Sequence, residues 1–289
     1  MATVTSDRKS FFKSFAGNQN TAEAKMGFFD HVEDLRWHLI RACAVFIITA
    51  AILFMRIDWI FDHIITAPAR ADFVSYGALC RFGHWMHIGD ALCMPPVNIN
   101  LQVNTVNGTF TSALSIAAIG GFIISLPYIL WEIWRFVKPG LSIKEKKYAR
   151  GGIFWISFYF FCGAAFGYFL MAPFTYNFLS TFTLGKYGMI KYIPSIDDYI
   201  SSLSNVTLGC GLAFELPIIA YLLAKLGIIT ASFLKKQFKI ALVIIMIVAG
   251  IITPSPDWIS QLIVSIPLII LYWISILLVS KVDKQRVKV

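Results

Sequence analysis

The sequence predicts an all-α integral membrane protein with six transmembrane helices and both termini in the cytoplasm. Three observations carry this prediction: the composition, six apolar stretches, and the distribution of positive charge. Hydrophobic residues make up 57% of the 289 residues and charged residues only 14%, with a mean hydropathy of +0.70. Soluble domains average about 25% charged residues, so this composition indicates a chain that lies mostly in lipid.

Six apolar stretches define the expected spans. A helix needs about 20 residues to cross about 30 Å of hydrocarbon. We expect spans at residues 39–55, 113–134, 152–172, 200–226, 238–252 and 259–280. The fifth covers only about 22 Å at 1.5 Å per residue, and Pro267 interrupts the sixth. We therefore expect the last two helices to be short, forming a hairpin around the turn that holds Pro254 and Asp257.

The distribution of Lys and Arg predicts the orientation. If the N-terminus is cytoplasmic, only five of the 25 basic residues lie outside: Arg56, Arg70, Arg81, Lys186 and Lys191. The positive-inside rule then places both termini in the cytoplasm. We expect residues 1–25 to form a disordered tail, 26–280 the membrane domain and 281–289 a basic tail. The surplus of positive charge indicates contact with anionic lipids, and no base-stacking module indicates nucleic-acid binding.

One acidic residue, Glu215, lies near the middle of the fourth span. A carboxylate at bilayer depth costs about 3 kcal/mol on insertion scales. An acid that is kept there indicates a functional site or a partner-binding site. The alternative is a protonated or internally paired glutamate that only helps the helices to pack.

Acidic residues also gather before the first span. Apolar residues recur there at helical spacing, which predicts an amphipathic helix that lies on the membrane and continues into the span: Phe28, Val32, Leu35 and Leu39. The polar face holds Asp30, Glu33 and Asp34. The alternative is that these acids only complement the helix dipole, an effect confined to the first turn. This explains Asp30 well and Asp34 poorly.

The loop after the second span carries one acid among basic residues. Pro127 lies towards the end of that span, and Pro139-Gly140 breaks the helix and predicts a tight turn. Glu145 follows in a segment whose other charges are all positive. Its alternative interpretation is a weak exposed salt bridge with a neighbouring lysine.

Five segments together resemble the TatC family, the multispanning core subunit of the twin-arginine protein translocase. HVEDLRWHL at 31–39 is similar to the family's HLxELRxRL, with Asp34 in place of Glu and His38 in place of the second Arg. The other four segments are Ala67-Pro68 after span one, Phe136, Pro139, Leu141 and Glu145 after span two, FELP at Phe214–Pro217, and TPSPDWISQ at Thr253–Gln261. The resemblance covers about residues 26 to 280.

The resemblance implies a receptor for the twin-arginine signal peptides of folded proteins, in a translocase driven by the proton-motive force. Guanidinium groups bind best to carboxylates held in fixed places, which suits Asp34 and Glu145, with Phe136 as an apolar or ring surface. The remaining residues of the implied signal-peptide site are Glu33, Arg36, Pro139 and Leu141.

The resemblance also implies partners in the inner membrane of a prokaryote. These are small single-span subunits of the TatA/TatB type, in hetero- and homo-oligomers. A polar residue on their helix would contact Glu215, with Thr253 and Gln261 on the same concave face. Structural roles fall to Pro68, Pro127, Pro254 and Asp257.

Enzymatic activity is not expected. The sequence contains no GxxxxGK[ST] phosphate-binding loop and no recognisable nucleophile–base pair, and we expect no cofactor. A proton-coupled secondary transporter of a small solute that uses Glu215 is the alternative function. Spans one to three do not resemble spans four to six, so no inverted repeat supports that alternative.

Two cysteines in the long first outer loop, about residues 57–112, suggest a disulfide. Cys80 and Cys93 lie there alone, in an oxidising compartment. Cys43, Cys162 and Cys210 fall inside spans and read as small apolar residues. The rival is a metal site that adds His84 and His87, although its spacing fits no common zinc pattern, and we expect no metal.

Overall fold

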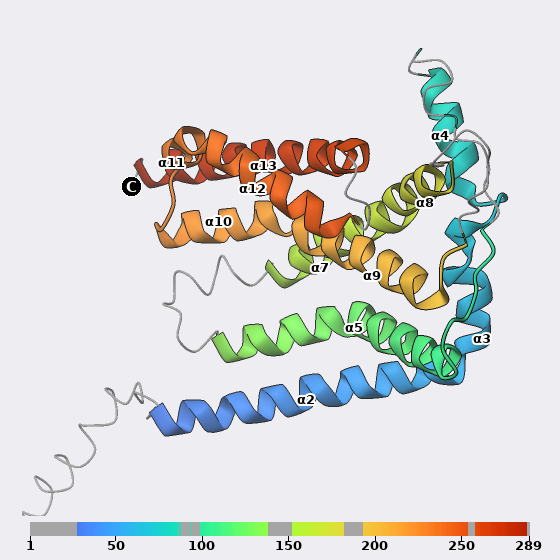
Figure 1. The fold of residues 1–289 in the computed structure, drawn as a ribbon. Coiled ribbons are helices and arrows are strands. Elements are labelled where there is room, and N and C mark those ends of the chain that lie inside the picture. Colours follow the sequence, from blue (N-terminus) through green and yellow to red (C-terminus); the bar gives the residue numbers. More distant parts are fainter. Residues whose placement is uncertain are drawn as a thin grey trace, which may run out of the picture.

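The computed structural model describes residues 28–85, 87, 93, 99–137, 152–181, 193–253 and 258–287. These parts are helical, and the β-structure within them is one isolated bridge between Gln102 and Ser195. The long helices lie side by side, as Figure 1 shows. Five helical stretches are long and apolar enough to cross a membrane, and a sixth apolar helix is shorter.

The first two long helices are antiparallel neighbours (Figure 1). Helix α2 (Phe28–Met55) joins the predicted amphipathic segment and the first span in one helix of 28 residues. Helix α5 (Gly108–Val137) has 30 residues and keeps Pro127 in its interior. At 1.5 Å per residue both helices exceed about 40 Å, so each is longer than the hydrocarbon layer is thick.

The third and fourth spans are each built from more than one helix. In the third, α7 (Gly152–Phe166) continues through the π-helical turn η5 (Gly167–Met171) into α8 (Ala172–Thr181). The fourth consists of α9 (Ile196–Ala213) and α10 (Leu216–Leu226). A turn at Phe214 and Glu215 separates the last two, and Pro217 follows in the first turn of α10, where a missing N–H is tolerated.

The prediction that both of the last helices are short is correct for one of them and wrong for the other. After α11 (Ala231–Lys236), α12 (Phe238–Ile252) has 15 residues, but α13 (Trp258–Val287) has 30. Pro267 does not end α13, because packed neighbours in a membrane bundle can satisfy the carbonyl that a proline leaves free. The Asp283 carboxylate accepts a hydrogen bond from the Ala231 N–H at 2.7 Å, which holds the end of α13 against α11.

The outer connection forms a cap of short helices at the end of the molecule opposite the C-terminus (Figure 1). It comprises α3 (Ile57–Ile60), the π-helical η1 (Phe61–Ile65), the 3₁₀ turn η2 (Ala67–Ala69) and α4 (Val74–Trp85), of which α4 was not predicted. Pro68 is buried, and its carbonyl accepts the hydroxyl proton of Tyr76 at 3.1 Å. Burial raises the pKa of Tyr76, so this phenol stays a donor.

Two tyrosines tie the cap to the membrane helices. The Tyr199 hydroxyl donates to the carbonyl of Ile65, and the Tyr168 hydroxyl donates to the carbonyl of Ile64, each at 2.6 Å. These carbonyls lie at the end of a π-helical segment, where intrahelical partners run out. The two hydroxyl groups therefore hold the cap in place by hydrogen-bonding to backbone carbonyls that have no partner within their own helix.

The helix ends that the charge distribution predicts to be cytoplasmic, called the inner ends below, gather at the other end of the molecule. Figure 1 shows the start of α2, the end of α5, the start of α7, the turn between α10 and α11, and the end of α13 at that end. The first and last described helices thus begin and end on the same side, as the distribution of positive charge requires.

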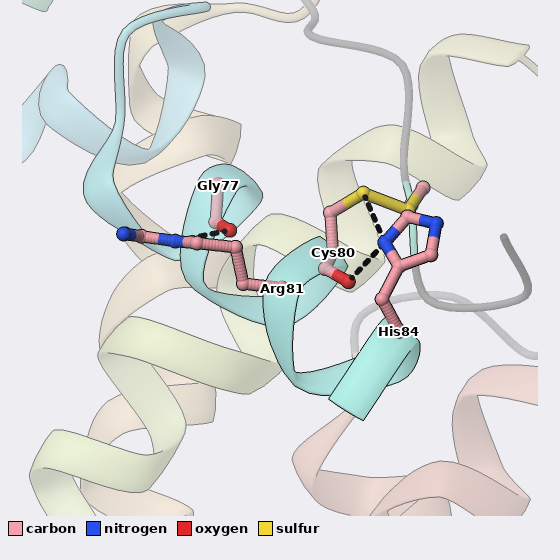
Figure 2. The surroundings of a disulfide bond; sticks show 5 residues. Gly77, Cys80, Arg81 and His84 are labelled. Carbon is pink, nitrogen blue, oxygen red and sulfur yellow. Dashed lines mark hydrogen bonds between the residues drawn. A yellow bond between two sulfur atoms is a disulfide. The ribbon is translucent and has the colours of Figure 1, made fainter. Parts of the chain in front are cut away.

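Cys80 and Cys93 are joined by a disulfide bond (Figure 2). His84 lies one turn after Cys80 on α4, with its Nδ1 3.0 Å from the Cys80 carbonyl oxygen and 3.8 Å from its Sγ. One ligand atom from each of these three residues falls within 4.8 Å of the others. Because the two sulfur atoms are bonded to each other, a metal ion could use them only after reduction.

Membrane topology can be tested with reporter fusions. The charge distribution puts Val103 and Tyr187 on the outer side, so fusions after either residue should report the outer compartment. Tyr187 lies outside the described residues, and the test does not depend on its structure. A cytoplasmic signal at either position would contradict the six-span arrangement.

Non-reducing mass mapping of the purified protein tests the outer-loop bridge. The peptides that contain Cys80 and Cys93 should be covalently linked, and reduction should lower stability by about 3 kcal/mol, the entropy-model value for closing about 14 residues. The three remaining cysteines are the internal control for adventitious oxidation. Two free thiols without bound metal would refute both the disulfide and the rival metal site.

Candidate functional site

A buried carboxylate links α2 to α5 near their inner ends. Glu132 is 1% exposed. Its Oε2 lies 2.5 Å from Nδ1 of His38 on α2, and its Oε1 accepts the hydroxyl proton of Tyr128 at 2.9 Å. The Arg135 guanidinium approaches Oε1 to 3.9 Å. The charge of Glu132 is therefore balanced and hydrogen-bonded within the protein, as burial of a carboxylate requires.

The sequence did not single out Glu132 or the partner role of His38. Glu132 lies near the end of an apolar span and close to an arginine. Charged residues are common at that depth, where they contact the membrane surface, so nothing in the sequence marks this acid as buried. The available signal was the spacing of Tyr128, Glu132 and Phe136, which places a phenol, an acid and a ring on one face of α5. His38 had been noted only as a departure from a family pattern.

The same contact brings two predicted site residues to facing positions. Asp34 precedes His38 by one turn on α2, and Phe136 follows Glu132 by one turn on α5. Because the two helices are antiparallel (Figure 1), both residues lie one turn further towards the inner end. The rings of His38 and Phe136 meet edge to face with centroids 6.3 Å apart, which fixes Phe136 beside α2.

Asp34 has the properties of an acid that is available to a ligand. It is half-buried, and within the described part of the chain no hydrogen bond or ion pair engages its carboxylate. Glu33 and Arg36 are exposed on other faces of α2 and are not brought to Phe136. Arg135 stands over the Trp131 ring at 4.9 Å, so it is already occupied by aromatic and acidic neighbours.

Three predicted members of this site fall outside the described residues. Pro139, Leu141 and Glu145 belong to the segment 138–151, of which the structure describes nothing. Its two flanks, the end of α5 and the start of α7, lie at the same end of the molecule as the start of α2 (Figure 1).

Glu215 occupies the turn between α9 and α10 and is 8% exposed. Both carboxyl oxygens are buried, and neither makes a hydrogen bond that meets ordinary distance and angle limits with a described residue. An acid buried in this way lacks the compensation that its burial requires.

Close packing of α7 against the end of α9 produces this environment. A Cβ on Gly163 would lie 2.5 Å from the Cys210 carbonyl oxygen and 2.7 Å from the Cβ of Phe214. Only a glycine lets α7 approach so closely, as small residues commonly do where membrane helices meet. The turn at Phe214 and Glu215 is thereby pressed against α7, and Glu215 is covered.

Thr253 and Gln261 are used within the C-terminal hairpin. The Thr253 hydroxyl donates to the Ala249 carbonyl at 3.0 Å, and Gln261 Nε2 donates to the Met246 carbonyl at 2.7 Å. These bonds satisfy α12 and join it to α13, and neither is directed at Glu215. Pro254 and Asp257, in the turn between these helices, lie outside the described residues.

Comparison with known proteins identifies the family. The family described as Sec-independent protein translocase protein (TatC) matches residues 30–267. The chain belongs to the TatC family. The TatC protein of Blattabacterium sp. subsp. Periplaneta americana is 38% identical over 263 residues, which cover 91% of this chain and 98% of that protein. The TatC protein of Carboxydothermus hydrogenoformans is 37% identical over 87% of this chain and 91% of that protein.

Solved structures agree with this assignment. A crystal structure of a twin arginine translocase receptor, TatC, superposes with a TM-score of 0.66 at 29% identity and covers 88% of this chain and 99% of that one. A second crystal structure of a TatC receptor, in DDM, gives 0.68, with 86% and 99% covered. The chain is thus a multi-pass component of a protein translocase in a prokaryotic inner membrane and is not an enzyme. The resemblance seen in its motifs is confirmed.

Proposed function

We propose that this chain is the receptor for twin-arginine signal peptides and the core of a translocase that exports folded proteins with the proton-motive force. One observation carries the proposal: the His38 ring meets the Phe136 ring of α5, and Asp34, one turn before His38, is a half-buried acid with no partner among the described residues. The solved TatC relatives, described as twin arginine translocase receptors, support it.

The chemistry of this site suits an arginine pair. A guanidinium presents a rigid fork of donors that a carboxylate accepts in two places, and it also stacks on aromatic rings. Asp34 provides a carboxylate of this kind, and Phe136 provides an aromatic ring. We assign the second carboxylate to Glu145, because an arginine pair would be repelled by the basic segment around it unless it met that acid.

Glu215 supports the partner part of the proposal. We infer that a polar side chain on the helix of a small TatA/TatB-type subunit hydrogen-bonds to this carboxyl, which has no partner within the described residues. Interhelical hydrogen bonds in membranes contribute about 1 kcal/mol each. Thr253 and Gln261 stay part of the proposed docking face; within the chain, Gln261 joins α13 to α12, and the Thr253 hydroxyl bonds to the Ala249 carbonyl of its own helix.

A proton-coupled solute transporter is not favoured by these observations. Membership of a protein translocase family argues against it. Such a transporter could use Glu215, but it would have no need of the acid and aromatic residues at the inner ends of α2 and α5. We therefore keep the receptor function as the conclusion.

Removing the site acids should weaken signal-peptide binding. A charge-assisted hydrogen bond contributes about 1.5–3 kcal/mol, so Asp34→Ala should lower the affinity by roughly 10- to 150-fold. Glu145→Ala should cost more, because Asp34 is the shorter acid. Phe136→Ala should also weaken binding without unfolding α5. The measurement is crosslinking of a twin-arginine signal peptide to membranes that hold each variant in equal amount.

Glu33→Ala is the matched control for Asp34→Ala, since it removes the neighbouring acid from a different face of α2. Its loss of binding should be clearly smaller. If Asp34→Ala and Glu145→Ala both bind like the parent, the signal site lies elsewhere on the protein.

Glu215→Ala should weaken crosslinking of the single-span subunits and leave the protein inserted at normal abundance. The cause is loss of the group with which the partner's polar residue pairs. Ser157→Ala is the control, because the Ser157 hydroxyl is likewise buried without a hydrogen-bond partner in the described residues but carries no acid. Unchanged subunit crosslinking and transport in Glu215→Ala would support the packing role instead.

A further inference from the structure

Helix α2 packs along α5 but buries few of its own side chains. Among its residues 33–55 only Ala42 is buried, while large apolar side chains such as Ile47 and Ile52 are more than half exposed. Its main neighbour is α5 (Figure 1). Between two helices in lipid there is no hydrophobic driving force, so close packing and hydrogen bonds must fix their relative position.

Close packing fixes the distance between the two helices in the outer half. A Cβ on Gly121 would lie 2.9 Å from both the Cα and the Cβ of Ala50, and one on Gly120 would lie 2.9 Å from Leu53. These contacts between small residues set how near the two helices come in this half. They lie far along α2 from Asp34, so the inner half needs a contact of its own to fix its rotation.

A directional contact is found near the inner ends. His38 and Glu132 are 94 residues apart in sequence, and their 2.5 Å contact joins α2 to α5. Tyr128 and Arg135 hold the same carboxylate from within α5. Residues of α5 itself therefore hold the Glu132 carboxylate in place. Because that acceptor is fixed, the geometry of its hydrogen bond specifies where His38, and hence α2, can lie.

We propose that the His38–Glu132 pair is a positioning element of the signal-peptide site, which sets the register and rotation at which Asp34 faces Phe136. A slip of α2 by one residue would shift it by about 1.5 Å and turn it by about 100°. That rotation alone would carry Asp34 off the face that meets α5. The proposal rests on the signal-peptide function proposed above, and it adds two residues to that site which act without touching the peptide.

The pair also determines which acid remains available. Both oxygens of Glu132 are engaged by groups of this chain and the side chain is almost fully buried, so this carboxylate is not open to a peptide arginine. Asp34, one turn away, is half-buried and has no such partner among the described residues. Two acids at the α2–α5 interface thus have different roles: Glu132 positions the helices, and Asp34 remains available to bind the peptide.

Cysteine crosslinking tests the geometry without any peptide. A protein with Asp34→Cys and Phe136→Cys should crosslink α2 to α5 under mild oxidation, as mapped by mass spectrometry. Adding Glu132→Ala or His38→Ala should reduce the crosslinked fraction several-fold. Tyr128→Phe is the matched comparison, because it removes a bond to the same carboxylate and leaves the link between the helices, so it should reduce the fraction clearly less than either alanine variant. Equal crosslinking in all variants would overturn the proposal.

Peptide binding tests the consequence, in proteins that keep Asp34 and Phe136. Glu132→Ala and His38→Ala should each weaken binding of a twin-arginine signal peptide by about tenfold. His38→Arg, which still presents a donor and a positive charge to Glu132, should bind within about threefold of the parent. The exchange of His38→Glu with Glu132→His should bind better than either single alanine variant. Binding at the parent level in both alanine variants would overturn the proposal, and so would equal losses in His38→Arg and His38→Ala.

The two experiments separate this inference from the proposed function. If Asp34→Ala and Glu145→Ala leave peptide binding intact while the crosslinks still depend on Glu132, the receptor site is wrong and the helix-positioning role stands. If those acids are needed but neither the crosslinks nor the binding respond to His38 or Glu132, the receptor site stands and the inference fails.

Discussion

The arrangement of the inner end depends on one buried carboxylate that must be paired inside the protein. Glu132 is almost fully covered, so its charge has to be met by His38, Tyr128 and Arg135 rather than by water. Only His38 comes from another helix. That requirement fixes α2, whose apolar surface otherwise faces outward, and with it the half-buried Asp34 and the neighbouring ring of Phe136.

The two buried glutamates differ in how they are compensated, and the difference separates their roles. Glu132 and Glu215 are 1% and 8% exposed. The first is fully hydrogen-bonded within the chain, while both oxygens of the second lack a partner in the described residues. Burial alone therefore does not mark a functional acid in a membrane helix. Glu215, which stays without a hydrogen-bond partner among the described residues, is the acid for which we propose a partner from another chain.

Apolar stretches and helical periodicity predicted most of the helices. The amphipathic segment and first span did merge into α2, and α12 is as short as its 15 apolar residues imply. The length of α13 was mispredicted, because a proline is tolerated within a packed membrane helix and Pro267 was taken as an interruption. Helix α4 was missed because its apolar pattern is weak and lies in a loop defined only by cysteines and charges.

For the site, sequence motifs led to Asp34, Phe136 and Glu215 but not to the contact that organises them. Helical spacing shows which residues share a face of one helix, and it does not show which faces of two helices meet. The contact between His38 and Glu132, which are 94 residues apart in sequence, depends on which helix faces meet, so helical spacing alone does not predict it. Motifs likewise do not show that Gln261 bonds to the Met246 carbonyl of α12 and Thr253 to the Ala249 carbonyl within α12; the role of both residues towards a partner stays a prediction.

The central claim is that this site selects arginine pairs by the geometry of its acid and ring, rather than by charge alone. The most direct test compares two signal peptides that differ only in carrying twin arginine or twin lysine, bound to the purified full-length protein in lipid. Lysine keeps the charge but lacks the planar fork of donors. We predict that the twin-lysine peptide binds at least tenfold more weakly. Equal affinity for the two peptides would contradict the account.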